Sequence, residues 1–504
     1  MSILIRGATV LAMGGPNGRT PFSGDVLIEG DVIAAIGPKL EAPEGATVID
    51  GTDRLVMPGL VNAHLHSAEA LFKGRYDNLP LELWMLYSYP ILGTKPLSDR
   101  LIYLRSMLVA MESLRTGVTC LTDDLYEAPR QSVDQLGAAM QAYDDVGIRA
   151  TVSGHIMDRN FLHSIPYSAE HVPQALQDEV AKLTPPTADE YVAFAKEAHA
   201  RFHGRSGRLR FMVAPSAPQR CTPELMQAAN ELALEWKVPF HTHIVETKVQ
   251  GVTGPALYGK TLMAYMRDLG LMHPGVTIAH SIWVTRDDIA LMGEAGVSIV
   301  HNIISNQKLG AGIAPVRELL EAGVNVALGS DGICSNDTPR MFDVMKACGL
   351  AAKMTSQDYA RWLDAGEVLH ACTLAGAKSA MIDHETGSLE VGKKADLLIL
   401  DMTTENFSPF NDVKNHLVYC ENGGSIEKVF VNGEIVAENG RLTKVSQAEI
   451  LAELRALMPE FNVYHAGVEA KNKAFEPAFH QIYQRCNAQR IGVHRLLPDD
   501  PWAR

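Results

Sequence analysis

The chain has 504 residues, of which 46% are hydrophobic and 21% charged, with a formal net charge of -14. This composition is typical of a globular protein with a large apolar core and argues against a disordered chain. The negative charge and the lack of a basic run argue against partners such as nucleic acids or anionic membranes, so we expect a small-molecule substrate.

The sequence carries no sign of export or of membrane anchoring. The opening stretch MSILIRGATVLAM lacks a cationic segment followed by a long apolar one, and no stretch is long enough to span a bilayer. The seven cysteines are scattered without a CxxC pair, as in proteins whose thiols stay reduced. We therefore expect a cytoplasmic location.

The two ends of the chain share one pattern of short strands and glycine turns. It appears first in ILIRGATVLAM and DVLIEGDVIAAIG, and it returns in ADLLILDM and EKVFVNGEIVAENGRL. Residues 1–56 and 388–442 are therefore predicted to form one small composite β-sandwich domain, which the middle of the chain interrupts.

Residues 57–387 alternate between apolar segments that end in polar residues and segments with helical periodicity. The eight apolar segments are LVMPGLVNAHLH, GVTCLTDD, IRATVSGHIMD, RLRFMVAPSAP, VPFHTHIVE, GVTIAHSIWV, GVSIVHNIIS and NVALGSDG. This alternation predicts an α/β fold, a (β/α)8 TIM barrel with its reactive groups at the C-terminal ends of the strands. A doubly wound sheet is the competing topology, but no glycine-rich phosphate loop follows the first strand.

After the second β segment the pattern becomes helical, as in AEILAELRALMPEF. Residues 443–504 are accordingly predicted to be a helical C-terminal extension.

Two histidines, His64 and His66, end the first predicted barrel strand. Residues i and i+2 of a strand point the same way, so this pair can chelate a metal ion. His243, His280 and Asp331 end the fifth, sixth and eighth strands, where they can supply further ligands. A single buried histidine is more often a core residue, but nitrogen and oxygen ligands at several strand ends favour a catalytic metal site with an open position.

Five segments resemble the amidohydrolase superfamily, and more narrowly its branch of cytosine, guanine and methylthioadenosine/adenosylhomocysteine deaminases and triazine hydrolases. They are PGLVNAHLH, HTHIVET, IAHSIWV, VHNIISNQKLGAGIAPV and GSDGICSND. The resemblance covers nearly the whole chain. It implies that one divalent cation is bound, with zinc expected and iron the alternative. The implied ligands are His64, His66, His243 and Asp331. The fourth strand has no lysine to carry the carbamate of two-metal members, so one ion is expected.

The resemblance also implies the catalytic residues. Glu246 corresponds to the glutamate that protonates a ring nitrogen, Asp331 takes a proton from the attacking water, and His280 orients the nucleophile. The expected activity is hydrolytic deamination of an aminated N-heterocycle, in which a metal-bound hydroxide attacks the ring carbon and ammonia leaves.

Substrate-binding residues are predicted from their positions in loops. They are Trp84, which can pack on a flat ring, and His301, Asn302, Asn306 and Asn336 around the pocket. For each of these residues a local structural role, such as loop capping or core packing, is the alternative. Where nucleoside-processing members carry a ribose-binding glutamate this chain has Gly93, which favours a pyrimidine, a purine base or a triazine over a nucleoside.

Other activities stay open. A triazine-type hydrolase would displace chloride or an alkylamine from the same kind of ring, although the presence of both Glu246 and Asp331 favours ammonia as the leaving group. Nucleoside deamination, cyclic amide hydrolysis and a non-catalytic scaffold rank lower. By its resemblance the chain is expected to form a homodimer or a larger homo-oligomer.

Overall fold

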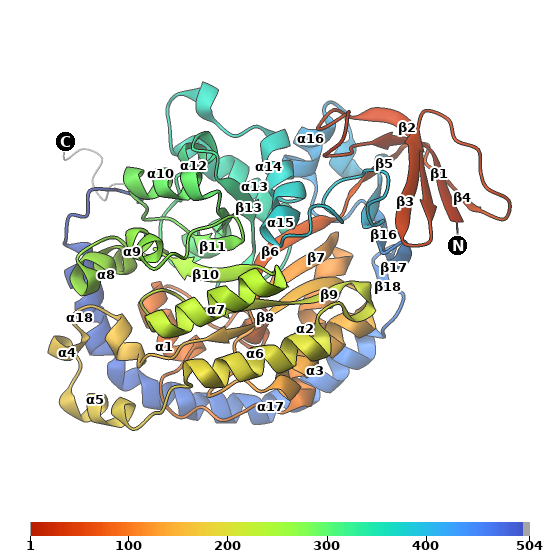
Figure 1. The fold of residues 1–504 in the computed structure, drawn as a ribbon. Helices are drawn as coiled ribbons and strands as arrows, with labels where there is room; N and C mark the ends of the chain where they lie inside the picture. The colour runs from red at the N-terminus through yellow and green to blue at the C-terminus, as the bar shows by residue number, and fades with distance from the viewer. Residues whose placement is uncertain (1, 497–504) are drawn as a thin grey trace.

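The computed structural model describes residues 2–496. Residue 1 and residues 497–504, which fall within the predicted end domain and C-terminal extension, lie outside the described residues. The chain forms a barrel with a separate mixed sheet at its side, called the small sheet, which contains β1 (Ser2–Val10) (Figure 1).

The small sheet is built from both ends of the chain. Its strand order is β18-β17-β16-β15-β5-β1-β2-β3, with β4 paired to β1. Its strands are β1 (Ser2–Val10), β2 (Phe22–Glu29), β3 (Val32–Gly37), β4 (Thr47–Asp50), β5 (Arg54–Pro58), β15 (Leu397–Asp401), β16 (Ile426–Val431), β17 (Glu434–Glu438) and β18 (Arg441–Leu442). The two ends meet where β5 pairs antiparallel with β15, so that Leu55 lies opposite Leu400.

The second sheet is the barrel, and its strands pair in parallel in chain order. They are β6 (Leu60–His66), β7 (Val118–Asp123), β8 (Arg149–Ile156), β9 (Leu209–Pro215), β10 (Phe240–Ile244), β11 (Val276–His280), β12 (Ser298–His301), β13 (Asn325–Leu328) and β14 (Asp331–Gly332). The eighth strand is split into β13 and β14. Because β13 pairs with β12 and β14 pairs with β6, the eighth strand closes the cylinder.

Helices cover the outside of the barrel. They are α1 (Leu81–Ser88), α2 (Asp99–Arg115), α3 (Val133–Val146), α4 (Ser168–His171), α5 (Gln174–Ala181), α6 (Ala188–Phe202), α7 (Pro223–Trp236), α8 (Lys248–Tyr258), α9 (Leu262–Asp268), α10 (Arg286–Ala295), α11 (Ile303–Lys308), α12 (Val316–Glu321), α13 (Met341–Ala351), α14 (Ala365–Ala371), α15 (Leu374–Ser379), α16 (Val413–Asn415), α17 (Gln447–Asn472) and α18 (Glu476–Asn487). The sequence explains where α7 begins, since the Thr222 side chain accepts a hydrogen bond from the Leu225 amide and proline follows at the first helical position.

The predicted fold class is confirmed: a (β/α)8 barrel carries a separate mixed sheet made from both ends of the chain. β5 ends at Pro58 and β6 begins at Leu60, close to the predicted start of the catalytic domain. The domain boundaries themselves stay predictions.

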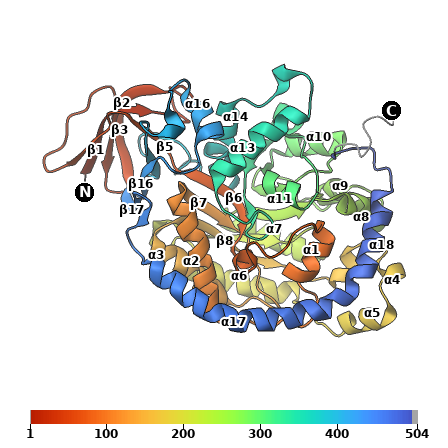
Figure 2. The same ribbon diagram turned by 180° about the vertical axis from the view of Figure 1, so that it is seen from behind.

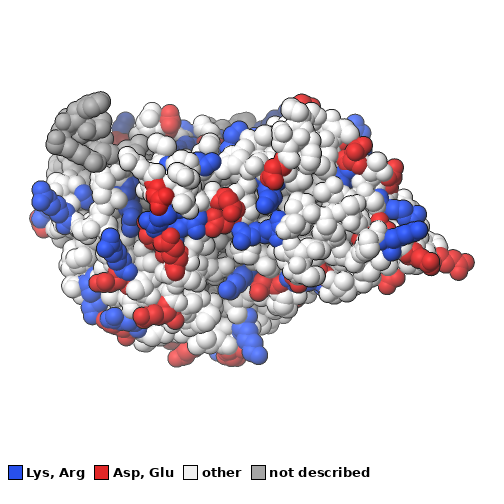
Figure 3. Space-filling model, turned by 90° about the horizontal axis from the view of Figure 1, so that it is seen from above, with Lys and Arg blue, Asp and Glu red and all other residues white. Residues whose placement is uncertain are grey.

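The long helix α17 runs from the side of the small sheet along the barrel past α2, and α18 lies beside α8 and α4 (Figure 2). On the face shown in Figure 3, acidic and basic side chains alternate over the surface. Within residues 2–496, every helix is too short or too polar to cross a bilayer.

Candidate active site

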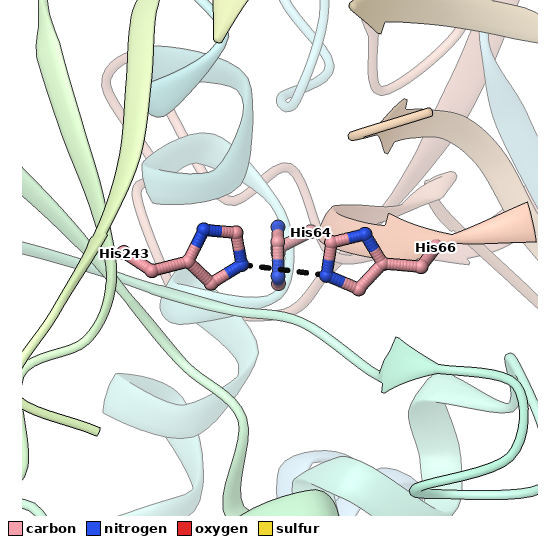
Figure 4. A group of neighbouring side chains, drawn as sticks. All are labelled: His64, His66 and His243. Atoms are coloured by element: carbon pink, nitrogen blue, oxygen red, sulfur yellow. Dashed lines mark hydrogen bonds between the residues drawn. The ribbon is translucent and has the colours of Figure 1, made fainter. Parts of the chain in front are cut away.

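The four predicted metal ligands meet at the C-terminal mouth of the barrel. His64 and His66 come from β6, His243 from β10 and Asp331 from β14. The Nε2 atoms of His64 and His66 lie 3.3 and 3.5 Å from Oδ1 of Asp331. The Nε2 atoms of His66 and His243 lie 3.3 Å apart, and the two rings approach each other from opposite sides (Figure 4). Donor atoms of His64, His66 and His243 lie within 4.8 Å of one another, and so do those of His64, His280 and Asp331. The two groups overlap at His64, so their donor atoms are close enough to share one ion.

The hydrogen bonds of two of these rings set their tautomers. Nδ1 of His66 lies 2.7 Å from the carbonyl oxygen of Asp124, and Nδ1 of His243 lies 3.0 Å from that of Ser216. A carbonyl only accepts, so each Nδ1 is protonated and donates, which leaves the Nε2 lone pairs facing each other. Two bare lone pairs at this separation repel, so a cation has to lie between them: a metal ion or, without one, the proton that His66 takes up. This donor set therefore fits a divalent metal ion.

His64 completes the set from one side. Its Nδ1 lies 2.9 Å from Nε2 of His241, one step deeper on β10. Its own Nε2 is buried and, apart from the approach of Asp331 at 3.3 Å, has no hydrogen-bond partner among the described residues. Such an orphaned nitrogen is costly in a protein interior unless it binds a ligand. His241 thus supports His64 from below, and His243 is the β10 histidine that faces the shared point.

The electrostatics of the cluster suit ligand chemistry. Burial lowers the pKa of His64 to about 4 and that of His243 well below its usual value, so both rings are neutral. Burial also opposes protonation of His66, but nearby carboxylates, Glu69 first, outweigh it and raise its pKa to about 9. Burial would raise the pKa of Asp331, yet the surrounding imidazoles hold it well below its usual range. The cluster thus stabilises a positive charge at its centre.

Glu246 and His280 lie beside the predicted ligands. Nε2 of His280 is 3.7 Å from Oε2 of Glu246 and 3.9 Å from Oδ2 of Asp331, so one imidazole faces two carboxylates. Nδ1 of His280 lies 3.0 Å from Oδ1 of Asn306, which fixes the ring. Burial raises the pKa of Glu246, which favours a protonated carboxyl that can donate.

The side chains of His280 and Asp331 are positioned by strained backbone conformations. His280 and Asp331 have φ angles of 72° and 63°, in the left-handed region that non-glycine residues seldom occupy. Each such residue costs on the order of 1–3 kcal/mol, and these conformations concentrate at functional sites. At the break in the eighth strand, Asn62 holds Ser330 through both its amide nitrogen and its amide oxygen. This brace presents Asp331 to the mouth of the barrel.

The donor cluster opens into a pocket. Its lining residues are His66, Glu69, Leu81, Trp84, Met85, Tyr89, His155, Met157, Arg220, His243, Glu246, His280, Leu309, Asp331 and Ser335. Trp84, predicted to contact substrate, is on this wall and reaches it from α1.

The other four predicted substrate-binding residues lie behind the wall. Asn302 and Asn306 approach Nδ1 of His280 from the side away from Glu246, and His301 is buried beside them. The Asn336 amide donates to the carbonyl of Ser330. Within the described chain these four residues support their neighbours instead of lining the pocket, and their role in substrate binding stays a prediction.

Several pocket residues had no role in the sequence interpretation. Glu69 accepts a hydrogen bond from the Tyr89 hydroxyl and one from the Cys334 amide. Asp124 holds His155 through its carboxylate and His66 through its carbonyl. The sequence could have pointed to two of them, because Glu69 follows His66 by three residues and Asp124 directly follows the second barrel strand.

Comparison with known proteins agrees with this geometry. A family model described as "Amidohydrolase family" matches residues 55–436. A 5-methylthioadenosine/S-adenosylhomocysteine deaminase of Moorella thermoacetica is 33% identical over 463 residues, covering 90% of this chain and 99% of that protein. A 5'-deoxyadenosine deaminase of Methanosarcina barkeri is 32% identical, covering 91% of this chain and 98% of that protein.

Solved structures show the same fold. An adenosine deaminase from Xanthomonas campestris with bound zinc has a TM-score of 0.80 at 28% identity, covering 92% of this chain and 98% of that one. An atrazine chlorohydrolase from Arthrobacter aurescens in complex with zinc has a TM-score of 0.81 at 26% identity, covering 91% and 100%. With a family match over most of its length and relatives aligned nearly end to end, this chain belongs to the amidohydrolase family.

Proposed function

We propose that this chain is a metal-dependent hydrolytic deaminase of an aminated N-heterocycle, acting on a carbon–nitrogen bond other than a peptide bond. One observation carries the proposal: three imidazole nitrogens and the carboxylate of Asp331 converge beside Glu246 and His280 in a single pocket. The deaminases among its relatives support it, because they align over about nine-tenths of this chain.

His64, His66, His243 and Asp331 are the residues that would hold one divalent cation. Zinc is the proposed ion, because both of the solved structures compared above contain zinc, and iron is the alternative. When bound in such a site, a divalent cation lowers the pKa of a water ligand to about 7 and so supplies a nucleophile at neutral pH.

The remaining steps are proton transfers by the chain's own residues. Water supplies the oxygen that joins the ring carbon, and Asp331 accepts the proton that this water loses. Glu246 donates a proton to the ring nitrogen, and Asp331 passes the proton it took from water to the exocyclic nitrogen, which leaves as ammonia when the carbon–nitrogen bond breaks. The proton of the new hydroxyl group returns to Glu246 as the ring carbonyl forms. His280 faces both carboxylates and can hold the attacking oxygen between them.

The proposed substrates are pyrimidines, purine bases and triazines. Trp84 on the pocket wall offers a flat apolar surface to such a ring. Gly93, at the position of the glutamate that the family's nucleoside deaminases carry, has no side chain for a ribose, and a Cβ there would lie 2.9 Å from the Lys471 side chain. This favours a free heterocycle over the nucleosides named for the curated relatives.

Displacement of chloride or an alkylamine from a triazine is the second candidate. It is favoured by the structural similarity to the atrazine chlorohydrolase. Chloride leaves without a proton, so that reaction has less need of the buried carboxyl of Glu246. A cytoplasmic location and a homodimer or larger assembly remain part of the proposal on the sequence alone.

The test is a substrate screen on protein of known metal content. Amino-pyrimidines, aminopurines, their nucleosides, aminotriazines and chlorotriazines are incubated with the enzyme, and ammonia and chloride are measured separately. We expect ammonia release, loss of activity after chelation, and recovery with one zinc per chain. Chloride release without ammonia would select the second candidate, and activity that survives complete metal removal would overturn the mechanism.

A further inference from the structure

Arg220 is the one lysine or arginine among the described residues that line the active-site pocket. It follows the end of β9, and it shares the pocket wall with Glu69, Glu246 and Asp331. A guanidinium stays protonated at physiological pH and presents five N–H donors in one plane. The pocket therefore contains a fixed positive charge besides the metal ligands.

The fully buried arginines among the described residues are paired with carboxylates. Arg105, 2% exposed, binds Glu127, and Arg149, fully buried, binds Asp396 with its Nε 2.6 Å from Oδ2. This is the usual arrangement, since an unpaired buried charge is strongly unfavourable. Arg220, which is only partly buried, has no such partner: within residues 2–496 no carboxylate lies within ion-pair distance of its guanidinium.

The contacts that Arg220 does make are weak ones. Its Nη1 lies 3.4 Å from the Ser216 hydroxyl, and its Nη2 lies 3.3 Å from the Met85 sulfur, a poor acceptor. The guanidinium carbon lies 5.9 Å from the centre of the Phe161 ring, near the limit of a cation–π contact. Glu246 and Glu82 attract the guanidinium only from beyond ion-pair distance. These contacts orient the head group between the end of β9 and α1 and leave donors free for a ligand in the pocket.

We propose that Arg220 binds an oxygen acceptor on the substrate ring, either a carboxylate or a ring carbonyl, and so selects substrates that carry one. This inference rests on the proposed function and narrows its substrate class. The Ser216 hydroxyl contacts Arg220, and the Ser216 carbonyl accepts the Nδ1 hydrogen bond of His243. Ser216 would therefore fix the distance between the bound end of the substrate ring and the predicted metal ligand. The guanidinium geometry suits a planar acceptor with two lone pairs.

The experiment compares matched substrates. For each of the pyrimidine, purine and triazine rings, three compounds share the amino-bearing carbon and carry hydrogen, an oxo group or a carboxylate elsewhere on the ring. We expect the wild type to prefer an acceptor-bearing compound by about 10²-fold in kcat/KM, a range typical when a site loses its hydrogen-bonding partner. Arg220→Gln should erase this preference and leave the hydrogen compound unchanged within about threefold.

Further variants separate the two acceptors and the structural explanation. Arg220→Lys should keep part of a preference for the carboxylate compound, because lysine keeps the positive charge. It should lose a preference for the oxo compound, because that preference depends on the planar N–H donors of the guanidinium. Arg159→Gln is the control, because Arg159 lines a neighbouring cavity and its guanidinium binds the Tyr258 hydroxyl. It should keep the wild-type selectivity.

Two results overturn the inference: a wild type that handles all three compounds alike, or an Arg220→Gln enzyme slowed equally on all of them. If no compound of any ring releases ammonia, the proposed function fails instead, and calorimetry of the same ring carboxylates decides the role of Arg220. Binding by the wild type that weakens at least tenfold in Arg220→Gln supports it, and equal or absent binding refutes it.

Discussion

The carboxylate of Asp331 contacts three neighbouring side chains. Oδ1 faces His64 and His66, while Oδ2 accepts a hydrogen bond of 2.6 Å from the Ser305 hydroxyl. A residue that both binds a cation and accepts a proton cannot be replaced by a neutral amide of the same shape, since the amide gives up both the charge and the basicity.

Asp331→Asn should therefore lower kcat/KM by at least about 10³-fold and leave the fold intact, given that one acid/base group alone is worth 10²–10⁴. The variant should also hold less zinc, because it lacks one proposed ligand. Ammonia release measures the rate, zinc per chain the metal content, and thermal unfolding the fold. Ser305→Ala is the matched control: it removes only the hydrogen bond to Oδ2 and should cost about tenfold or less. A near-normal rate in Asp331→Asn would remove this residue from the mechanism.

Glu246 lies in the same pocket, but its proposed task is proton delivery and not metal binding. Glu246→Gln keeps the shape and removes the transferable proton, so kcat should fall by at least about 10²-fold. Zinc content should match that of the wild type, which distinguishes this variant from Asp331→Asn. If Glu246→Gln loses both zinc and activity, Glu246 helps to build the metal site and its assignment as the proton donor is wrong.

At the scale of elements, one buried ion pair ties the barrel to the small sheet. Arg149 on β8 and Asp396 just before β15 are both fully buried at their side chains, and Asp396 also accepts a hydrogen bond from the Asn432 amide. Asp396 cannot reach water, so its charge depends on Arg149. The pair fixes where the returning end of the chain docks on the barrel.

Arg149→Met should lower the free energy of unfolding by about 3–5 kcal/mol, the usual cost of stranding a buried charge. Urea unfolding measures it, and Arg149→Met combined with Asp396→Leu should recover part of the loss. Arg201→Met provides the surface control, because Arg201 and Asp134 are exposed, and should leave the stability nearly unchanged. Equal effects of Arg149→Met and Arg201→Met would contradict the proposed coupling.

The barrel strands and the place where the predicted ligands meet could be predicted from the sequence. Apolar runs with polar ends predicted the eight barrel strands, and the histidine pair of the first strand predicted the mouth where the ligands meet. The break of the eighth strand before Asp331 was not predictable, since it depends on Asn62, 268 residues away. Arg220 was missed for a related reason: its lack of an ion-pair partner is a property of the folded pocket and has no local signal.

At the scale of the whole molecule, the C-terminal helices α17 and α18 pack against the segment that carries Trp84. The Asn472 side chain on α17 accepts hydrogen bonds from the amides of Ile91 and Leu92, just after α1. Phe479 on α18 lies in one apolar cluster with Leu83 and Leu86 of α1. The extension thus holds α1 in place, and α1 forms part of the pocket wall.

Phe479→Ala tests this role, because truncation of both helices could unfold the chain. Removing a fully buried phenyl ring should cost about 3–5 kcal/mol of stability. Because α1 would loosen while the metal ligands on the strands keep their places, KM should rise several-fold with zinc content unchanged. Val463→Ala on the exposed side of α17, where Val463 is 78% exposed, is the control and should alter neither quantity. A Phe479→Ala enzyme with lower stability but an unaltered KM would show that the extension stabilises the fold without shaping the pocket.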